Sequence, residues 1–169
     1  QLAAEPAAGL VFVDESVANT KMARLGGRSP AGERLVAHVP HGNYQTSTLI
    51  AAVRLAGACA PWVFTGAMDG EMFLAWVRQG LAPALHPEDL VVMDNLATHK
   101  VVGVREAIEA VGARLLYLPP YSPDFNPIEN MWSKIKQLLR SLAPRTGEEL
   151  LQAAALAFAA VSAADCRGF

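Results

Sequence analysis

The stretch LVVMDNLATHKVVGVREAIEAVGARLLYL, residues 90–118, decides the fold class. It opens with four apolar residues, 90–93, and closes with a second apolar run, 115–118, each as short as a strand buried on both faces. Between them, residues 98–111 place valine and isoleucine at helical spacing, and Gly112 follows as a helix C-cap. Two buried strands joined through a helix predict parallel pairing in an α/β fold.

A third apolar run, Leu10-Val11-Phe12-Val13, predicts another buried strand, which we expect to end at Asp14 and Glu15. Beyond it, residues 34–39 and 44–55 predict two further strands joined by a short turn that contains glycine and asparagine. The second half of the sheet is therefore expected to be an antiparallel meander beside the parallel strands.

Helices are predicted for most of the other segments. Asp69 can cap a helix that follows one more strand, at residues 61–64. Behind a proline-rich loop, Pro127 begins a helix whose apolar side chains repeat every 3.6 residues. The last helix starts with a capping box between Thr146 and Glu149.

Composition and length narrow the class of protein. Hydrophobic residues make up 52% of the 169 residues and charged residues 18%, which is typical of a packed globule and predicts one domain spanning residues 1–169. No apolar run reaches the roughly 18 residues of a membrane span, so we expect a soluble, cytoplasmic protein that contacts no membrane. Cys59 and Cys166 lack metal-ligand spacing and are predicted to be reduced thiols.

Three acidic residues stand where the predicted elements end or begin. Asp14 and Asp94 each follow a buried strand, and Glu129 lies in the opening turn of a helix. Ligands gather at the ends of such strands, so all three carboxylates can converge on one pocket if the two strands are neighbours. Carboxylate oxygens are the ligands that Mg²⁺ prefers. Two such ions about 4 Å apart can activate a water or a 3′-hydroxyl for attack at phosphorus.

Taken singly, each acid also has a purely structural explanation. An aspartate at a strand end is often a turn former or helix cap, and a glutamate in a first helical turn favours the helix dipole. The net charge of −2 also predicts weak affinity for nucleic acid.

The motifs around the acids resemble the DDE catalytic domain of mariner-like transposases, in particular their bacterial insertion-sequence branch. The resemblance lies in VFVDES at 11–16, in VVMDN at 91–95 with His99, and most specifically in LPPYSPDFNPIE at 118–129. Thirty-four residues separate the second acid from the third, a spacing similar to that of the family. The resemblance extends over nearly the whole chain.

This resemblance implies a ribonuclease-H-like mixed sheet, three antiparallel strands plus parallel strands, flanked by helices. It implies a DDE transposase that uses two Mg²⁺ or Mn²⁺ ions for DNA cleavage and strand transfer, with Asp14, Asp94 and Glu129 as catalytic and metal-binding residues. Its partners would be transposon ends and target DNA, bound by a homodimer, with the enzyme on the nucleoid of a bacterial cytoplasm. The family's N-terminal helix-turn-helix DNA-binding region has no counterpart in this sequence.

Other residues near the acids are candidates for supporting roles. Four of them could line the pocket, although capping and surface roles explain the same residue types; Glu15 would point away from Asp14 on a continuing strand. Basic side chains could contact the DNA backbone, or could form a solvated face. The pocket candidates are Glu15, Asn95, His99 and Asn126, and the backbone-contact candidates are Arg24, Arg28, Lys134, Lys136 and Arg140.

Two other functions fit the same residues. One is a ribonuclease-H-like nuclease that hydrolyses nucleic acid without joining strands. The other is a catalytically inactive transposase remnant that acts as a DNA-binding or assembly module, because a fold does not fix a function.

Overall fold

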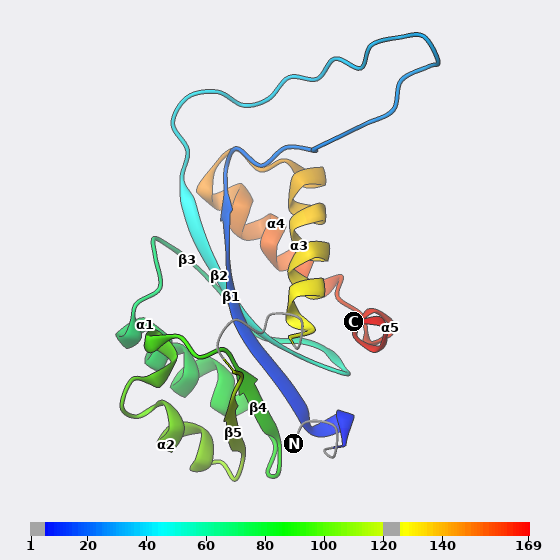
Figure 1. The fold of residues 1–169 in the computed structure, drawn as a ribbon. Coiled ribbons are helices and arrows are strands. Elements are labelled where there is room, and N and C mark those ends of the chain that lie inside the picture. The colour runs from blue at the N-terminus through cyan, green and yellow to red at the C-terminus, as the bar shows by residue number, and fades with distance from the viewer. Residues whose placement is uncertain (1–5, 120–125) are drawn as a thin grey trace.

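The computed structural model describes residues 6–119 and 126–169 and contains a five-stranded mixed sheet (Figure 1). The spatial order is β3-β2-β1-β4-β5; β1, β2 and β3 pair antiparallel, while β1, β4 and β5 pair parallel. The expected mixture of antiparallel and parallel strands is thus confirmed. The strands are β1 (Leu10–Asn19), β2 (Thr46–Arg54), β3 (Gly57–Thr65), β4 (Leu90–Met93) and β5 (Arg114–Tyr117).

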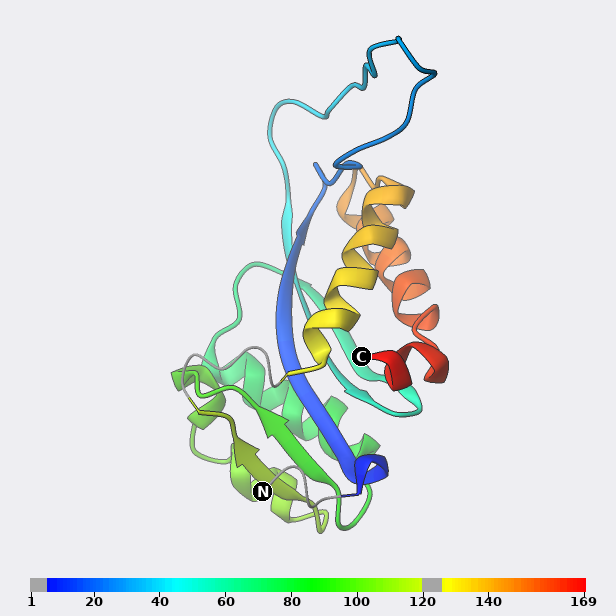
Figure 2. The same cartoon turned by 45° about the vertical axis from the view of Figure 1, so that its right-hand side comes forward.

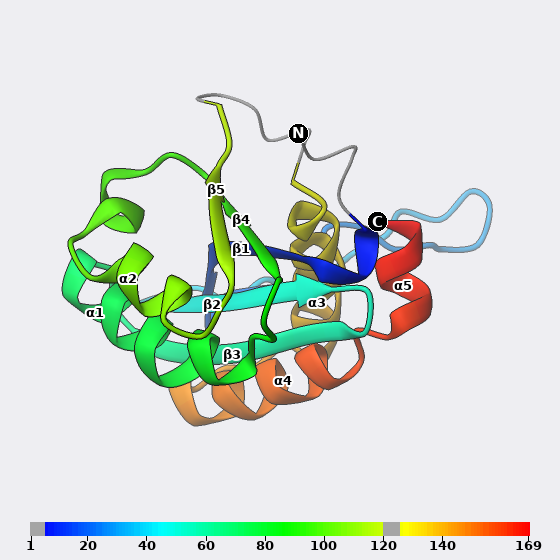
Figure 3. The ribbon, with the colours of Figure 1, turned by 90° about the horizontal axis from the view of Figure 1, so that it is seen from below.

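Helices cover both faces of the sheet. In Figure 1, α1 and α2 lie on one side, with α3 and α4 on the other, and Figure 3 shows α4 running along β3. No helix within the described ranges is long and apolar enough to cross a bilayer. The helices are α1 (Gly70–Trp76), α2 (Val104–Glu109), α3 (Ile128–Leu142), α4 (Gly147–Ala159) and α5 (Ala163–Gly168), with 3₁₀ turns at Ala7–Gly9, Ala82–Ala84 and Ala97–Lys100 and a π-helical turn at Val77–Leu81.

Side-chain alternation along β1 and β2 divides the core into two layers. Val13 and Ile50 are fully buried on the α1 and α2 face, while Leu49 and Ala51 are fully buried on the α3 and α4 face. Burial on both faces explains why β2 is apolar almost without interruption.

The capping signals in the sequence act as predicted. The Asp69 carboxylate accepts from the Met72 backbone N–H at 2.8 Å at the start of α1. Thr146 Oγ1 accepts from the Glu149 N–H at 3.1 Å, and the Glu149 carboxylate accepts from the Thr146 N–H at 3.2 Å. Gly112 adopts the left-handed conformation, φ 81°, after α2. These local contacts fix where the helices begin and end.

The prediction that the first strand ends at Asp14 is wrong, because β1 continues to Asn19. Asp14 pairs with Ala51 of β2 in the antiparallel ladder. What ends near Asp14 is the parallel pairing with β4, whose last registered pair is Phe12 with Val92. Asp14 and Glu15 therefore lie just past the end of the parallel β1–β4 ladder, whereas the antiparallel β1–β2 ladder continues along the rest of β1.

The strand predicted at residues 34–39 is also wrong. Residues 22–45 form a long connection between β1 and β2 without a regular helix or strand, and it projects from the body of the molecule (Figure 1). Val36 is 75% exposed, and both edges of β1 are already occupied by β2 and β4. Residues 34–39 pair with none of the five strands, so a strand-like local pattern does not by itself make this segment part of the sheet.

The single helix predicted over residues 98–111 is divided in two. A 3₁₀ turn, Ala97–Lys100, precedes α2, and Gly103 lies between them at φ 100°. This left-handed backbone is readily adopted by glycine and breaks the helical run. The short helix α5 was not anticipated from the sequence.

A buried ion pair joins β2 to the turn before β4. The Asp89 carboxylate accepts from Arg54 Nη2 at 2.9 Å and from the His86 backbone N–H at 2.7 Å. The Arg54 side chain is 11% exposed and that of Asp89 is 6% exposed. Removing one partner would leave the other charge largely desolvated and alone.

We therefore expect Asp89→Ala to lower the free energy of unfolding by about 3–5 kcal/mol, measured by urea denaturation. The matched control is Glu109→Ala, which removes the exposed Arg105–Glu109 pair and should cost less than about 1 kcal/mol. Equal losses in the two variants would contradict a structural role for the buried pair.

Candidate active site

Strand register places Asp14 beside Asp94. Phe12 of β1 is registered with Val92 of β4 in a parallel pair, and each acid follows two residues later. Residues two apart in a strand share a face of the sheet, so Asp14 shares the face of Phe12, which packs with Val92 in one apolar cluster. The charge of Asp94 acts on Asp14. Asp94 directly follows the end of β4, as the sequence predicts.

Helix α3 brings Glu129 to the same place. Trp132, one turn along α3 from Glu129, donates from its indole Nε1 to Asp14 Oδ2 at 3.0 Å. Glu129 is exposed, three residues before Trp132 on the helix, and its charge acts on the Asp14 carboxyl group. The first turn of α3 therefore lies against the strand that carries Asp14, and Figure 2 shows α3 running alongside β1.

The electrostatics of Asp14 reflect this convergence. Burial raises the pKa of Asp14 to about 7; the Glu15 backbone N–H opposes the rise, and the charges of Glu15, Glu129 and Asp94 add to it. Several carboxylates thus act on one another in a partly desolvated place. Such a group is stabilised when a cation is bound among the carboxylates, because the cation offsets both burial and repulsion.

His99 lies between two of the acids. Its side chain is fully buried, with Nε2 2.9 Å from Glu15 Oε2 and Nδ1 2.6 Å from Asp94 Oδ1. The second contact lacks hydrogen-bond geometry. The ring stacks on Phe73 with centroids 4.3 Å apart, and the Tyr117 hydroxyl donates to the His99 carbonyl at 2.9 Å. His99 is therefore held from three sides and does not reach solvent.

His99 and the Asp94 carboxylate shift each other's pKa. Burial lowers the pKa of His99, but the Asp94 and Glu15 carboxylates raise it to about 9. Burial raises the pKa of Asp94, yet contacts with His99 and the Leu96 backbone N–H bring it below its ordinary value. The Leu96 N–H donates to Asp94 Oδ1 at 3.1 Å, the oxygen that also faces His99. Oδ1 is thus occupied within the protein, and no contact of Oδ2 is formed with the residues that the structure describes.

The donor set suits Mg²⁺, although the chain alone does not form a closed cage. Within residues 6–119 and 126–169, no three His, Cys, Asp or Glu side chains lie close enough to hold a metal ion by themselves. Mg²⁺ typically takes one or two carboxylates and fills its remaining positions with water and substrate phosphate. The mutual repulsion at Asp14 is the feature that such an ion would relieve.

The other predicted pocket residues have different surroundings. Asn126 is buried, and its side-chain oxygen accepts from the Ile128 N–H at 3.4 Å at the start of α3. Glu15 contacts His99 on the opposite face of β1 from Asp14, and Asn95 is half-buried after Asp94. Asp124 lies outside the described residues.

The basic candidates do not form one group. Arg24, Lys136 and Arg140 line a shared groove between the root of the β1–β2 connection and α3. Lys134 instead forms an ion pair with Asp165 of α5, with Nζ and Oδ2 2.5 Å apart. Arg28 is exposed on the projecting connection and lines neither of the cavities beside α3.

Sequence reasoning missed the residues that hold the acids. Trp132 is a core residue, only 2% exposed, and its indole N–H also binds Asp14. Its position three residues after Glu129 on an amphipathic helix was the available signal. Phe73 and Tyr117, which hold His99, come from α1 and β5, and no local pattern links them to the site.

Fold and site together define a ribonuclease-H-like domain with acidic residues at the junction of its parallel and antiparallel strands. The sequence profile described as "DDE superfamily endonuclease" matches residues 9–151, most of the chain. The protein therefore belongs to the DDE superfamily of endonucleases. No curated protein matches its sequence.

Solved structures with the same fold include those of Mos1 transposase. The Mos1 mariner paired end complex with Mn aligns at TM-score 0.74 and 16% identity, covering 99% of this chain and 53% of that one. The Mos1 Strand Transfer Complex aligns at 0.72 and 16%, covering 96% and 50%. The Mos1 catalytic domain with Raltegravir and Mg aligns at 0.68 and 16%, covering 99% and 79%. The chain spans about half the length of the Mos1 proteins in the two complexes.

The Lys134–Asp165 pair predicts an acid-sensitive contribution to stability. The Lys134 ammonium holds the pKa of Asp165 well below its usual range, helped by the Ser162 hydroxyl and N–H. A carboxyl whose pKa is lower in the folded state stabilises the fold above its unfolded pKa of about 4, and that contribution is lost as the pH falls further.

We expect Asp165→Asn to be less stable than the unmodified protein at pH 7, with the difference shrinking as the pH falls below about 4. Urea denaturation across this pH range measures it. A difference that stays constant with pH would show that the ionised carboxylate is not what stabilises α5.

Proposed function

We propose that the chain is the catalytic domain of a DNA transposase that cleaves DNA strands and joins them to a target, with Asp14, Asp94 and Glu129 holding two Mg²⁺ or Mn²⁺ ions. The proposal includes transposon-end and target DNA as substrates, a homodimer on DNA, residues 1–169 as one domain, and an origin in the bacterial insertion-sequence branch with a cytoplasmic location.

The observation that carries the proposal is the convergence of the three acids at Asp14. Asp94 directly follows β4, the parallel neighbour of β1, and Glu129 lies in the first turn of α3, whose Trp132 binds Asp14. The charges of Asp94 and Glu129 both act on the Asp14 carboxyl group. Capping or turn formation explains an acid by itself, but it does not require three acids to meet.

The comparisons support the choice of reaction and cofactor. The similar structures are of Mos1 transposase in strand transfer and paired end complexes, and with Mg or Mn. The family profile describes endonucleases. We transfer DNA, divalent metal and strand transfer from those proteins to this chain as part of the proposal.

The chain's own residues have distinct tasks in this mechanism. Bound divalent ions would supply activation of the attacking hydroxyl and neutralisation of the leaving oxygen. Trp132 orients Asp14 through Oδ2, and Leu96 and His99 fix Asp94 through Oδ1. His99 also ties Glu15 to this arrangement from the other face of β1. A site oriented in this way loses little freedom when its ligands bind.

The test is Asp94→Asn, measured for Mn²⁺ binding and for DNA chemistry. Nicking of supercoiled plasmid and joining of an oligonucleotide 3′-hydroxyl to plasmid DNA report hydrolysis and strand transfer separately. Loss of a metal ligand should weaken Mn²⁺ binding and slow both reactions by more than the roughly 10–100-fold typical of residues that merely support a ligand.

Asp69→Asn is the matched control, because it removes one carboxylate that is not among the proposed metal ligands while asparagine still caps α1. It should leave metal binding and both reactions unchanged. Nicking without joining would favour a hydrolysis-only nuclease. An unmodified protein that binds DNA but neither binds Mn²⁺ nor cuts would favour an inactive remnant, and full activity in Asp94→Asn would exclude the proposed site.

A further inference from the structure

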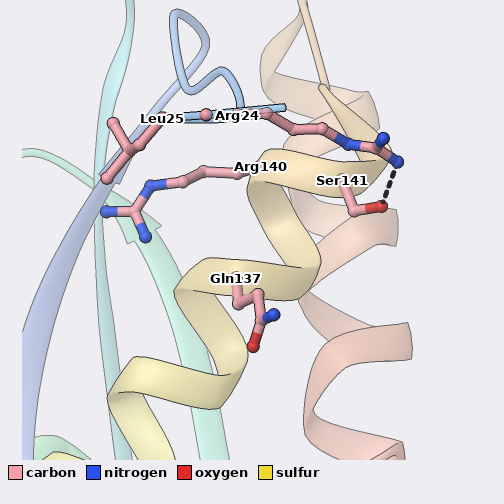
Figure 4. Close-up of a pocket in the computed structure, with 6 residues that line it drawn as sticks. Arg24, Leu25, Gln137, Arg140 and Ser141 are labelled. Carbon is pink, nitrogen blue, oxygen red and sulfur yellow. Dashed lines mark hydrogen bonds between the residues drawn. The ribbon is translucent and has the colours of Figure 1, made fainter. Parts of the chain in front are cut away.

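A groove lies between the root of the β1–β2 connection and the C-terminal half of α3. It consists of two adjoining cavities of about 440 and 450 Å³, which share Arg24, Leu25 and Arg140 as lining residues. Figure 4 shows Arg24 reaching over α3 to Ser141, whose hydroxyl accepts from Arg24 Nη2 at 3.0 Å, while the Arg140 side chain extends from α3 toward the strands. The root of the β1–β2 connection and helix α3 thus form the groove together.

The groove carries positive charge only. Lys21, Arg24, Lys136 and Arg140 line it, and no aspartate or glutamate is among its lining residues. Within the described part of the chain, neither Lys136 nor Arg140 forms an ion pair. Four cations in one groove stand out in a chain whose net charge is −2, and their mutual repulsion favours an anionic occupant.

The groove lies at a defined distance from the acids. Along α3, the eleven residues from Glu129 to Arg140 correspond to about 16 Å. Along β1, the five residues from Asp14 to Asn19, which also lines the groove, correspond to about 17 Å. Two elements that run side by side give the same separation (Figure 2). In duplex DNA, one strand places a phosphate every 3.4 Å or so along the axis, which makes this separation about five nucleotides.

We propose that this groove, lined by Lys21, Arg24, Lys136 and Arg140, binds the sugar-phosphate backbone of duplex DNA about five nucleotides from the phosphate at the carboxylates. The inference rests on the proposed function, in which DNA is the substrate, and deepens it by naming a surface that binds DNA. Lys134 is not part of the proposed DNA-binding surface because Asp165 neutralises it. Lys21 is included because it lines the groove.

The first test measures binding without cleavage. Fluorescence anisotropy of a 25-base-pair duplex is recorded in EDTA over a salt series, for the unmodified protein and for Lys136→Ala/Arg140→Ala. Each lost phosphate contact lowers the slope of log affinity against log salt by about 0.9, so the double variant should lower it by about 2 and weaken binding at every salt concentration.

The control carries the same change in charge elsewhere. Arg78→Ala/Arg105→Ala removes two exposed cations on the opposite side of the sheet, and it should leave the slope close to that of the unmodified protein. If the alanine variant melts at a lower temperature, Lys136→Gln/Arg140→Gln provides a second pair with similar side-chain length. An unchanged slope in both groove variants, or an equal fall in the control, overturns the inference.

A second test varies the length of the DNA duplex on one side of the cut phosphate. When cleavage is measured with Mn²⁺, duplexes that extend ten base pairs from the cut phosphate should react better than those that extend three, and the groove variants should lose this difference. A protein that binds duplex DNA through the groove but cleaves nothing contradicts the proposed function alone. Competition by inorganic phosphate with no affinity for duplex DNA would instead indicate a small-anion site and overturn the inference.

Discussion

The parallel pairing of β1 with β4 is the constraint on which the site depends. Only three residue pairs, ending at Phe12 and Val92, set the register that brings Asp14 beside Asp94. Because side chains alternate along a strand, a slip of one residue would turn Asp14 to the opposite face and bring Glu15 into its place. The register is fixed by the core, since Val11 and Val91 are fully buried on one face and Val92 on the other. Apolar packing that takes no part in the chemistry therefore decides which acids meet.

Local sequence patterns predicted those parts of the fold that local chemistry determines. Strand β4, the amphipathic helix α3 and the caps at Asp69 and Thr146 follow from burial, periodicity and hydrogen bonding within a few residues. Residues 34–39 have a strand-like pattern but pair with none of the five strands, and β2 and β4 occupy both edges of β1. The end of β1 was misplaced for the reverse reason, since antiparallel pairing with β2 carries the strand past its acids. Pairing is a property of the whole sheet, and a single stretch of sequence does not contain it.

The same distinction separates the acids of the site from the residues that orient them. Three acids are visible in the sequence because strand ends and a helix start mark their positions. Their supports come from elsewhere: Trp132 projects from α3 to Asp14, while Phe73 and Tyr117 hold His99 from α1 and β5. His99 was expected to face the pocket, yet it is fully buried between Asp94 and Glu15. A buried imidazole between two carboxylates restricts the orientation of the Asp94 side chain. The spacing between Asp94 and His99 in the sequence does not predict this contact.

Negatively and positively charged side chains lie at opposite ends of helix α3, the carboxylates at its start and the basic groove at its end. Helix α3 from Glu129 onward and strand β1 from Asp14 onward both run from the carboxylates to the basic groove, so one surface runs from concentrated negative charge to concentrated positive charge. A net charge of −2 conceals this arrangement, because acids and bases cancel in the sum without cancelling in space. A polyanion would be repelled at the carboxylate end unless cations were present there, and attracted at the other end without them. Backbone binding and chemistry would then respond differently to divalent metal, although a single helix and a single strand connect the two places.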